Sequence, residues 1–136
     1  MLFRSYPADL TAQTSYAEQL YISGRKDEAA KLYTTLIART DLLAPQKTAL
    51  RRQYAHLLAE QGDAAGEIIQ LQQVAAADPN DFESIGTLVQ RLNAAKRESE
   101  TLPYYETLLN QKAYAPPVRA KFYDRIGELL DRKSVV

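Results

Sequence analysis

Few residues in this sequence have the types and spacing that catalysis or metal binding requires. His56 is the only histidine and there is no cysteine, which excludes a multi-histidine site, a thiolate nucleophile and a cysteine-ligated metal. The carboxylate pairs Asp27/Glu28 and Glu98/Glu100 lie near expected turns, where we interpret them as solvated charges. No G-x-x-x-x-G-K-[ST] phosphate loop is present. The sequence therefore predicts a protein that is not an enzyme and that uses no cofactor and no metal.

Tyrosine is the other side chain that could carry function, through binding rather than catalysis. There are nine tyrosines and no tryptophan. Most fall on apolar helical spacing and are expected in the core, among them Tyr16, Tyr33, Tyr54 and Tyr105. Tyr21, three residues before Gly24, is the exception.

Composition limits the classes of partner. Seventeen basic and seventeen acidic side chains cancel, so we expect no nucleic-acid partner. No run of about 18 apolar residues is present, so we expect a soluble chain without membrane insertion. The opening "MLFRSYPADL" lacks the apolar stretch of a signal peptide. The localisation is left open between periplasm and cytoplasm.

Prolines and turn residues recur along the chain at regular intervals, and these intervals predict where the helices begin and end. Four of the six prolines are spaced by 38, 34 and 38 residues, and each of these four precedes a turn position by 17 residues. The prolines are Pro7, Pro45, Pro79 and Pro117, and the turn positions are Gly24, Gly62, Lys96 and Ser134. Proline suits the first turn of a helix, and glycine suits the left-handed residue that ends one.

Between these marks the apolar spacing is helical, so each unit is expected to be two antiparallel helices. Leu50, Tyr54, Leu57 and Leu58 form one such face, and Ile68, Leu71, Val74 and Ala75 form another. Four extra residues lie between alternate turns and the following prolines. Either the second helices or their exit loops are longer there by about one helical turn.

The positions around each turn carry a pattern of apolar, small and large residues. Counting back from the turns, they are Leu20, Ala17 and Tyr16; Leu58, Ala55 and Tyr54; Leu92, Val89 and Leu88; and Leu130, Gly127 and Ile126. With Ala29 and Tyr33 after the first turn, nearly the whole chain resembles the tetratricopeptide repeat (TPR) family. The resemblance implies an all-α fold, an α-solenoid of stacked antiparallel helix pairs that form a right-handed superhelix.

The expected array has about three full repeats with partial repeats at both ends. Its units are 10–45, 46–79, 80–117 and a partial 118–136, after a tail of a preceding repeat at 1–9. We interpret the chain as an excised segment of a longer array, and the alternative is a short protein with frayed ends.

Three residues depart from the family pattern. Glu67 and Thr101 stand where the family prefers alanine. Because a glutamate is costly to bury without a partner, we expect Glu67 to tilt outward, or its helix to rotate and present Ala65 and Gly66 instead. Pro103 predicts that the second helix of the third unit starts late, with Thr101 as its capping residue.

The resemblance implies a concave groove lined by the first helix of each unit. The implied groove positions are Thr14, Glu18, Tyr21 and Ile22; Arg52, His56, Ala59 and Glu60; Glu83, Gly86, Gln90 and Asn93; and Lys121, Asp124, Glu128 and Arg132. The candidate partner-binding residues are Tyr21, Arg52, His56, Asn93, Glu18 and Gln90, since aromatic and arginine side chains carry much binding energy. TPR co-chaperones that grip a terminal carboxylate need basic and amide groups at positions that here hold Thr14, Glu18, Gln53, Glu83 and Thr87. We do not expect such a clamp.

Three functions are compatible with the sequence. The leading one is a non-catalytic scaffold that binds a protein or peptide partner in the groove. The second is a periplasmic TPR segment of a bacterial envelope or exopolysaccharide-export machine, structural or polysaccharide-facing. The third is spacing or self-association through open solenoid ends.

Overall fold

The computed structural model describes residues 9–111 and 114–135, and this part of the chain contains helices and no strand. The all-α prediction is therefore confirmed. The chain divides into two compact units, residues 1–70 and 71–136. The helices are α2 (Leu10–Ile22), α3 (Lys26–Ile37), α4 (Ala44–Glu60), α5 (Ala64–Ala77), α6 (Phe82–Ala94), a short 3-10 helix η1 (Glu98–Glu100), α7 (Leu102–Leu108) and α8 (Pro116–Val135). The boundary between the units falls inside α5.

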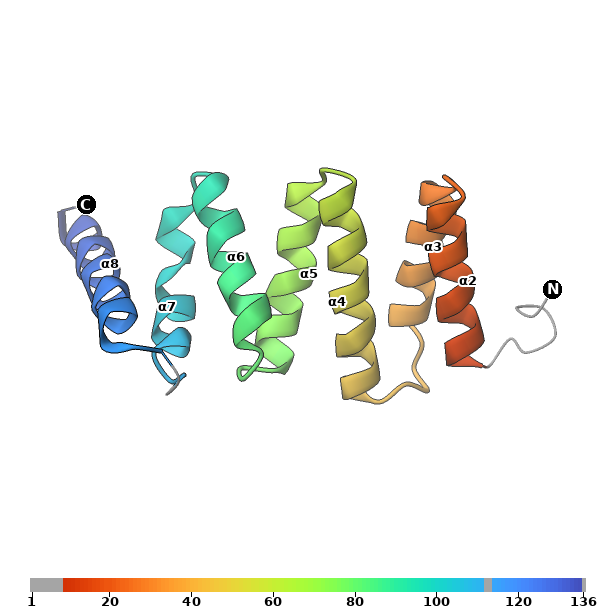
Figure 1. Cartoon of the computed structure of the whole chain (residues 1–136), viewed down its shortest axis with the longest axis horizontal. Helices are drawn as coiled ribbons and strands as arrows, with labels where there is room; N and C mark the ends of the chain where they lie inside the picture. The colour runs from red at the N-terminus through yellow and green to blue at the C-terminus, as the bar shows by residue number, and fades with distance from the viewer. Residues whose placement is uncertain (1–8, 112–113, 136) are drawn as a thin grey trace. The chain divides into compact units, whose positions relative to one another are not determined.

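Helices are joined in antiparallel pairs by tight turns at the predicted positions (Figure 1). Gly24 has φ 86°, Gly62 has φ 77° and Lys96 has φ 60°, so all three are left-handed. Each turn closes with a bond from the next amide to a carbonyl five residues earlier, the pattern that ends many helices. These bonds run from Arg25 to Leu20 (2.8 Å), from Asp63 to Leu58 (2.9 Å) and from Arg97 to Leu92 (2.8 Å).

The prolines follow the predicted phase with one exception. Pro45 and Pro117 lie in the first turns of α4 and α8, as expected. The prediction for Pro79 is wrong, because it lies in the turn before α6, and Asp81 is the N-cap there. A carboxylate at the N-cap satisfies an amide of the first turn, so the helix begins after it. Pro7 lies outside the described residues.

The four extra residues lie in the exit loops. Residues 38–43 join α3 to α4, residues 109–115 join α7 to α8, and only 78–81 join α5 to α6. The second helices before the longer loops are not extended, since α5 is longer than α3 and α7. The prediction of a turn at Ser134 is wrong, because α8 continues to Val135.

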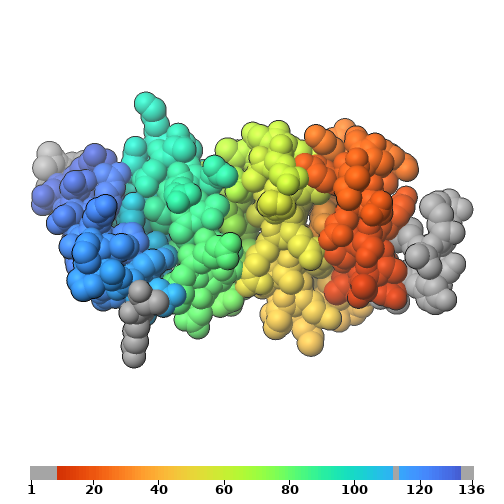
Figure 2. All heavy atoms as spheres, in the orientation of Figure 1, coloured from red at the N-terminus to blue at the C-terminus, as the bar shows by residue number. Residues whose placement is uncertain are grey.

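In the first unit, α3 packs against both α2 and α4. The core combines small and large apolar side chains, and Figure 2 shows side chains filling the space between these helices. Ala17 and Ala29 are fully buried, which lets α2 and α3 approach closely. The buried core residues are Ala17, Leu20, Ala29, Tyr33, Leu36, Leu50 and Leu57, with Tyr16 and Tyr54 partly buried against them.

Among the residues that depart from the family pattern, Glu67 and Thr101 differ in the structure from what the sequence predicts. Glu67 is 4% exposed, while Ala65 is exposed, so α5 neither tilts Glu67 outward nor rotates to bury Ala65. Glu67 makes an interaction within the structure, which offsets the cost of burying its side chain. The late start of α7 is confirmed, with Pro103 in its first turn. Thr101 is the N-cap residue of α7, as predicted, but its hydroxyl donates backward to the Glu98 carbonyl (2.6 Å) instead of accepting from an α7 amide.

The second unit repeats the first at an offset of 72 residues, the separation of Pro45 and Pro117. Aspartate caps the first helix of each unit: Asp9 Oδ1 accepts from Ala12 N, and Asp81 Oδ1 accepts from Ser84 N, both at 3.1 Å. An arginine–glutamate pair follows the turns at Gly24 and Lys96, as Arg25–Glu28 and Arg97–Glu100. A buried tyrosine of the second helix, Tyr33 or Tyr105, packs on an aromatic ring of the next helix, Tyr54 or Phe122, with 5.7 Å between ring centroids in both cases.

Candidate binding site

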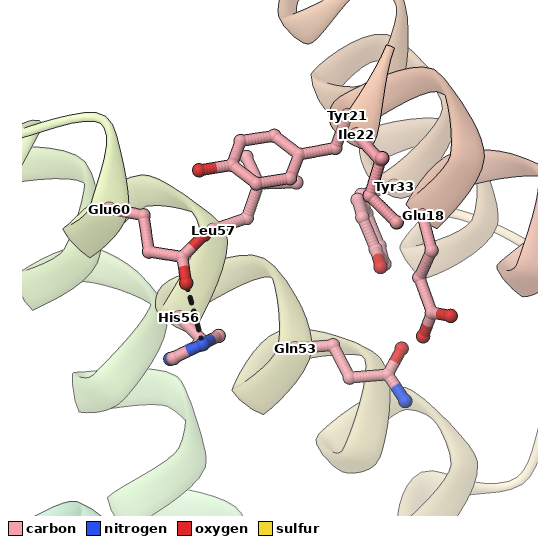
Figure 3. Close-up of a pocket in the computed structure, with 8 residues that line it drawn as sticks. All are labelled: Glu18, Tyr21, Ile22, Tyr33, Gln53, His56, Leu57 and Glu60. Atoms are coloured by element: carbon pink, nitrogen blue, oxygen red, sulfur yellow. Dashed lines mark ion pairs between the residues drawn. The ribbon is translucent and has the colours of Figure 1, made fainter. Parts of the chain in front are cut away.

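Two hollows lie in the first unit, on the side where α2 and α4 meet. The first, which we call the Tyr21 pocket, has a volume of about 320 Å³. It is lined by Glu18, Tyr21 and Ile22 of α2, Tyr33 of α3, and Gln53, His56, Leu57 and Glu60 of α4 (Figure 3). The second, the polar hollow, has a volume of about 360 Å³. Its lining is Leu10, Thr11, Thr14, Ser15, Glu18, Gln46, Ala49, Leu50 and Gln53.

The Tyr21 pocket has an apolar base that the core holds in place. Tyr33 is 2% exposed, and Leu57 is also buried. The Tyr33 ring stacks on Tyr54 with an interplanar angle of 12°, which fixes α3 against α4 behind the pocket. Ile22, at the rim, is 74% exposed and offers an apolar surface that nothing in this unit covers. An exposed isoleucine beside a hollow is the kind of surface that a partner side chain can bury.

Carboxylates supply the charge of the pocket. Glu18 makes no ion pair within the described residues. Glu60 lies 3.1 Å from His56 Nε2, and the dashed line in Figure 3 marks this pair. The ring of Tyr21 extends from α2 toward α4, with its hydroxyl on the side of Glu60. Hydrogen bonding to Glu60, burial, and the charge of that carboxylate together raise the pKa of Tyr21.

A cation already rests against one of these aromatic rings. Lys26 Nζ, at the start of α3, lies 5.5 Å from the centroid of the Tyr21 ring. Lys26 is not among the residues that line the pocket. The negative face of a tyrosine ring attracts cations at this distance, so the Tyr21 ring is a surface on which a cation can rest.

Tyr33 keeps its proton far into the alkaline range. Burial, and then the nearby charge of Glu18, raise its pKa to about 12. A neutral phenol hydroxyl at the base of the pocket can both donate and accept a hydrogen bond.

The two hollows adjoin, because Glu18 and Gln53 line both of them. Together they follow α2 from Leu10 to Ile22, a length of about 18 Å at 1.5 Å per helical residue. An extended chain rises about 3.3 Å per residue, so this length accepts about five or six residues of a partner segment.

The structure brings together three of the six predicted binding residues. Glu18, Tyr21 and His56 all line the Tyr21 pocket. Arg52 is partly buried on α4, outside this lining, and is engaged in another interaction.

The other two predicted residues, Gln90 and Asn93, belong to α6 of the second unit. Gln90 is exposed there. Asn93 is partly buried and its Nδ2 donates to the Tyr105 hydroxyl (3.2 Å), so its role in partner binding stays a prediction. Its Oδ1 is buried as well. Tyr105 draws Asn93 inward because a buried phenol oxygen needs a hydrogen-bond partner.

Three lining residues are not predicted by the sequence. Tyr33 and Leu57 have the spacing of core residues, although each also forms the base of the pocket. Gln53 enters the sequence argument only as part of a carboxylate clamp. Its spacing carries a usable signal, since Gln53, His56 and Glu60 lie three and four residues apart and so share one side of α4.

The arrangement offers recognition chemistry: an apolar base, an aromatic wall and two carboxylates. Among residues 9–111 and 114–135, no group of three or more His, Cys, Asp or Glu side chains could hold a metal ion. No described helix is long and apolar enough to cross a bilayer. A search with this sequence finds no matching protein-family model, and no curated protein matches it.

Proposed function

We propose that this chain is a non-catalytic interaction scaffold, a TPR-like α-solenoid that binds an extended segment of a partner protein between α2 and α4. The observation that carries the proposal is the pair of adjoining hollows on one side of the first unit. Glu18 and Gln53 line both, so the hollows follow one another along α2 as a channel lined by apolar and polar side chains. Such a channel suits a peptide, whose backbone and side chains require both kinds of contact.

The repeat pattern supports the solenoid part of the proposal. Three helix pairs share a left-handed residue at the turn, at Gly24, Gly62 and Lys96. The position five residues beyond each turn is buried in all three pairs, although it holds a different residue each time: Ala29, Glu67 and Thr101. Helix pairs with one internal geometry are the units from which solenoids are built.

Site-specific photo-crosslinking tests the proposal. A photoreactive residue replaces His56, whose side chain is 77% exposed in the Tyr21 pocket, in a cell extract of the source organism. The matched control places the same residue at Thr34, which is exposed on α3 and does not line either hollow. We expect a discrete crosslinked protein from position 56 and none from position 34.

A second variant ties the crosslink to the pocket. Ile22→Ser removes apolar contact at the exposed rim, adds no charge and disturbs no core packing. We expect it to reduce the crosslink from position 56 while helicity, measured by circular dichroism, is unchanged. Equal crosslinking from positions 34 and 56, or none from either, would contradict the proposed function.

A further inference from the structure

The 72-residue repeat shows what fills the corresponding place in the second unit. The counterpart of Gln53 on α4 is Arg125 on α8, and the counterpart of Tyr33 is Tyr105. The guanidinium of Arg125 is 2.8 Å from Glu128 Oε2 and lies close enough to the Tyr105 hydroxyl for that group to contribute to its raised pKa. Hydrogen bonding to Glu128 first, and then the charge and hydrogen bonding of Tyr105, raise the pKa of Arg125 against the effect of burial.

In the first unit the same place is open. Gln53 is shorter than an arginine and uncharged, and its side chain is exposed at the edge of the pocket. The base of the pocket is Tyr33, which stacks on Tyr54, whereas Tyr105 packs at a tilt on Phe122, a ring at a different position of the next helix. The first unit therefore retains the tyrosine against which an arginine packs in the second, without an arginine of its own at that position.

The charges around the opening complement a cation. Glu18 and Glu60 line the pocket, at positions that hold Gln90 and Arg132 in the second unit. Lys26 shows that the Tyr21 ring accepts a cationic group at 5.5 Å. The nearby groups that oppose a cation are Lys26 itself and, when protonated, His56, which already pairs with Glu60.

We propose that the Tyr21 pocket binds an arginine side chain of the partner segment, with the guanidinium between Glu18 and Glu60 against the Tyr33 hydroxyl. The inference rests on the proposed function and names the chemistry of the residue that the channel recognises. The planar guanidinium presents five donors, which suits two carboxylates and a phenol oxygen. Its methylene groups lie along Tyr21 and Leu57, as long basic side chains do on apolar surfaces.

The test uses a defined probe. Nα-acetyl-arginine amide is titrated into isotope-labelled protein, and backbone amide shifts are followed by NMR. The control ligand is Nα-acetyl-citrulline amide, which keeps the shape of arginine and lacks the charge. We expect saturable shifts at Glu18, Tyr21, Gln53 and His56 with the arginine ligand, and binding of the citrulline ligand weaker by about fivefold or more.

Two pairs of variants locate the site. Glu18→Gln and Glu60→Gln each remove one carboxylate and are expected to weaken arginine binding about three- to fivefold. Gln53→Arg copies the second unit and is expected to abolish binding, because its own guanidinium occupies the pocket. Gln53→Met is the matched control, a neutral unbranched side chain of similar length, and is expected to keep binding within about twofold of the wild type. Circular dichroism checks that all four fold.

Each contrary outcome overturns the inference. Equal binding of the citrulline ligand, shifts centred elsewhere, or no shifts at all would show that the pocket does not recognise the arginine charge. Loss of binding in Gln53→Met as well as Gln53→Arg would do the same. If these results accompany a discrete crosslink from position 56, the scaffold function stands and the arginine assignment fails; if that crosslink is also absent, both fail.

Discussion

The first and third helix pairs, α2–α3 and α6–α7, follow the same plan and expose different chemistry. Both have an aspartate N-cap, a left-handed turn residue and a buried tyrosine on the second helix. In the third pair, Asn93 and Arg125 are drawn in to the Tyr105 hydroxyl. In the first, Tyr21 and Gln53 occupy those positions and line a hollow beside Tyr33. The fold thus tolerates exchange at these positions, and the exchange decides whether the site is filled or open.

The two pairs also show which parts of the plan depend on residue type. Lys96 adopts the left-handed conformation that glycine has at the first turn, so the closing bond of the turn, rather than glycine itself, defines the position. The length of the second helix depends more strongly on residue type than the turn does. With Pro103 and η1 in the third pair, α7 has 7 residues where α3 has 12.

The largest effect is expected from matched cavities in the two cores. Leu36 on α3 and Leu108 on α7 are both at most 2% exposed and lie 72 residues apart. Leu36→Ala and Leu108→Ala are each expected to lower the free energy of unfolding by about 2 to 5 kcal/mol, because each removes buried methyl groups and leaves a cavity. Urea denaturation measures the loss. Thr35→Ala, at an exposed neighbour, is the control and is expected within about 0.5 kcal/mol of wild type. A small loss at only one of the two leucines would show that the two cores are not equivalent.

Smaller changes in stability, opposite in sign, are expected from substitutions at the turn residues Gly24 and Lys96. A Cβ added at Gly24 meets open space, so Gly24→Ala costs only the left-handed backbone, about 1 kcal/mol. Lys96→Gly relieves the same strain and is expected to stabilise the protein by up to about 1 kcal/mol. Thermal unfolding followed by circular dichroism measures both. If Lys96→Gly destabilises, its side chain does more than occupy the turn.

A further effect is confined to alkaline pH. An unfolded tyrosine titrates near pH 10, and Tyr33 in the folded chain has a pKa of about 12. Its contribution to stability is therefore complete below about pH 10 and is lost as the pH rises toward about 12. Tyrosinate absorbance of the wild type minus that of Tyr33→Phe isolates this group. A transition near pH 10 in the difference curve would refute the raised pKa and the burial that causes it.

Much of the fold could be predicted from the sequence. The phase of the prolines and turns locates the helix pairs, because left-handed turns and helix starts constrain residue type strongly. The burial of Glu67 and the role of Thr101 could not be predicted, since both depend on tertiary partners. The family resemblance points to Glu18, Tyr21 and His56, yet it also points to Asn93, which hydrogen-bonds inward to Tyr105. The importance of Gln53 could not be predicted, because it becomes clear only when Gln53 is compared with Arg125, the residue at the corresponding position of the second unit.

The structure of the Gln53→Arg variant decides whether the two units share one plan in which a single side chain fills or opens the tyrosine site. We expect the introduced arginine to enter the Tyr21 pocket. Its guanidinium would lie against the Tyr33 hydroxyl and a carboxylate of Glu18 or Glu60, as Arg125 lies against Tyr105. A guanidinium that points into solvent, with the pocket still open, would contradict the shared plan.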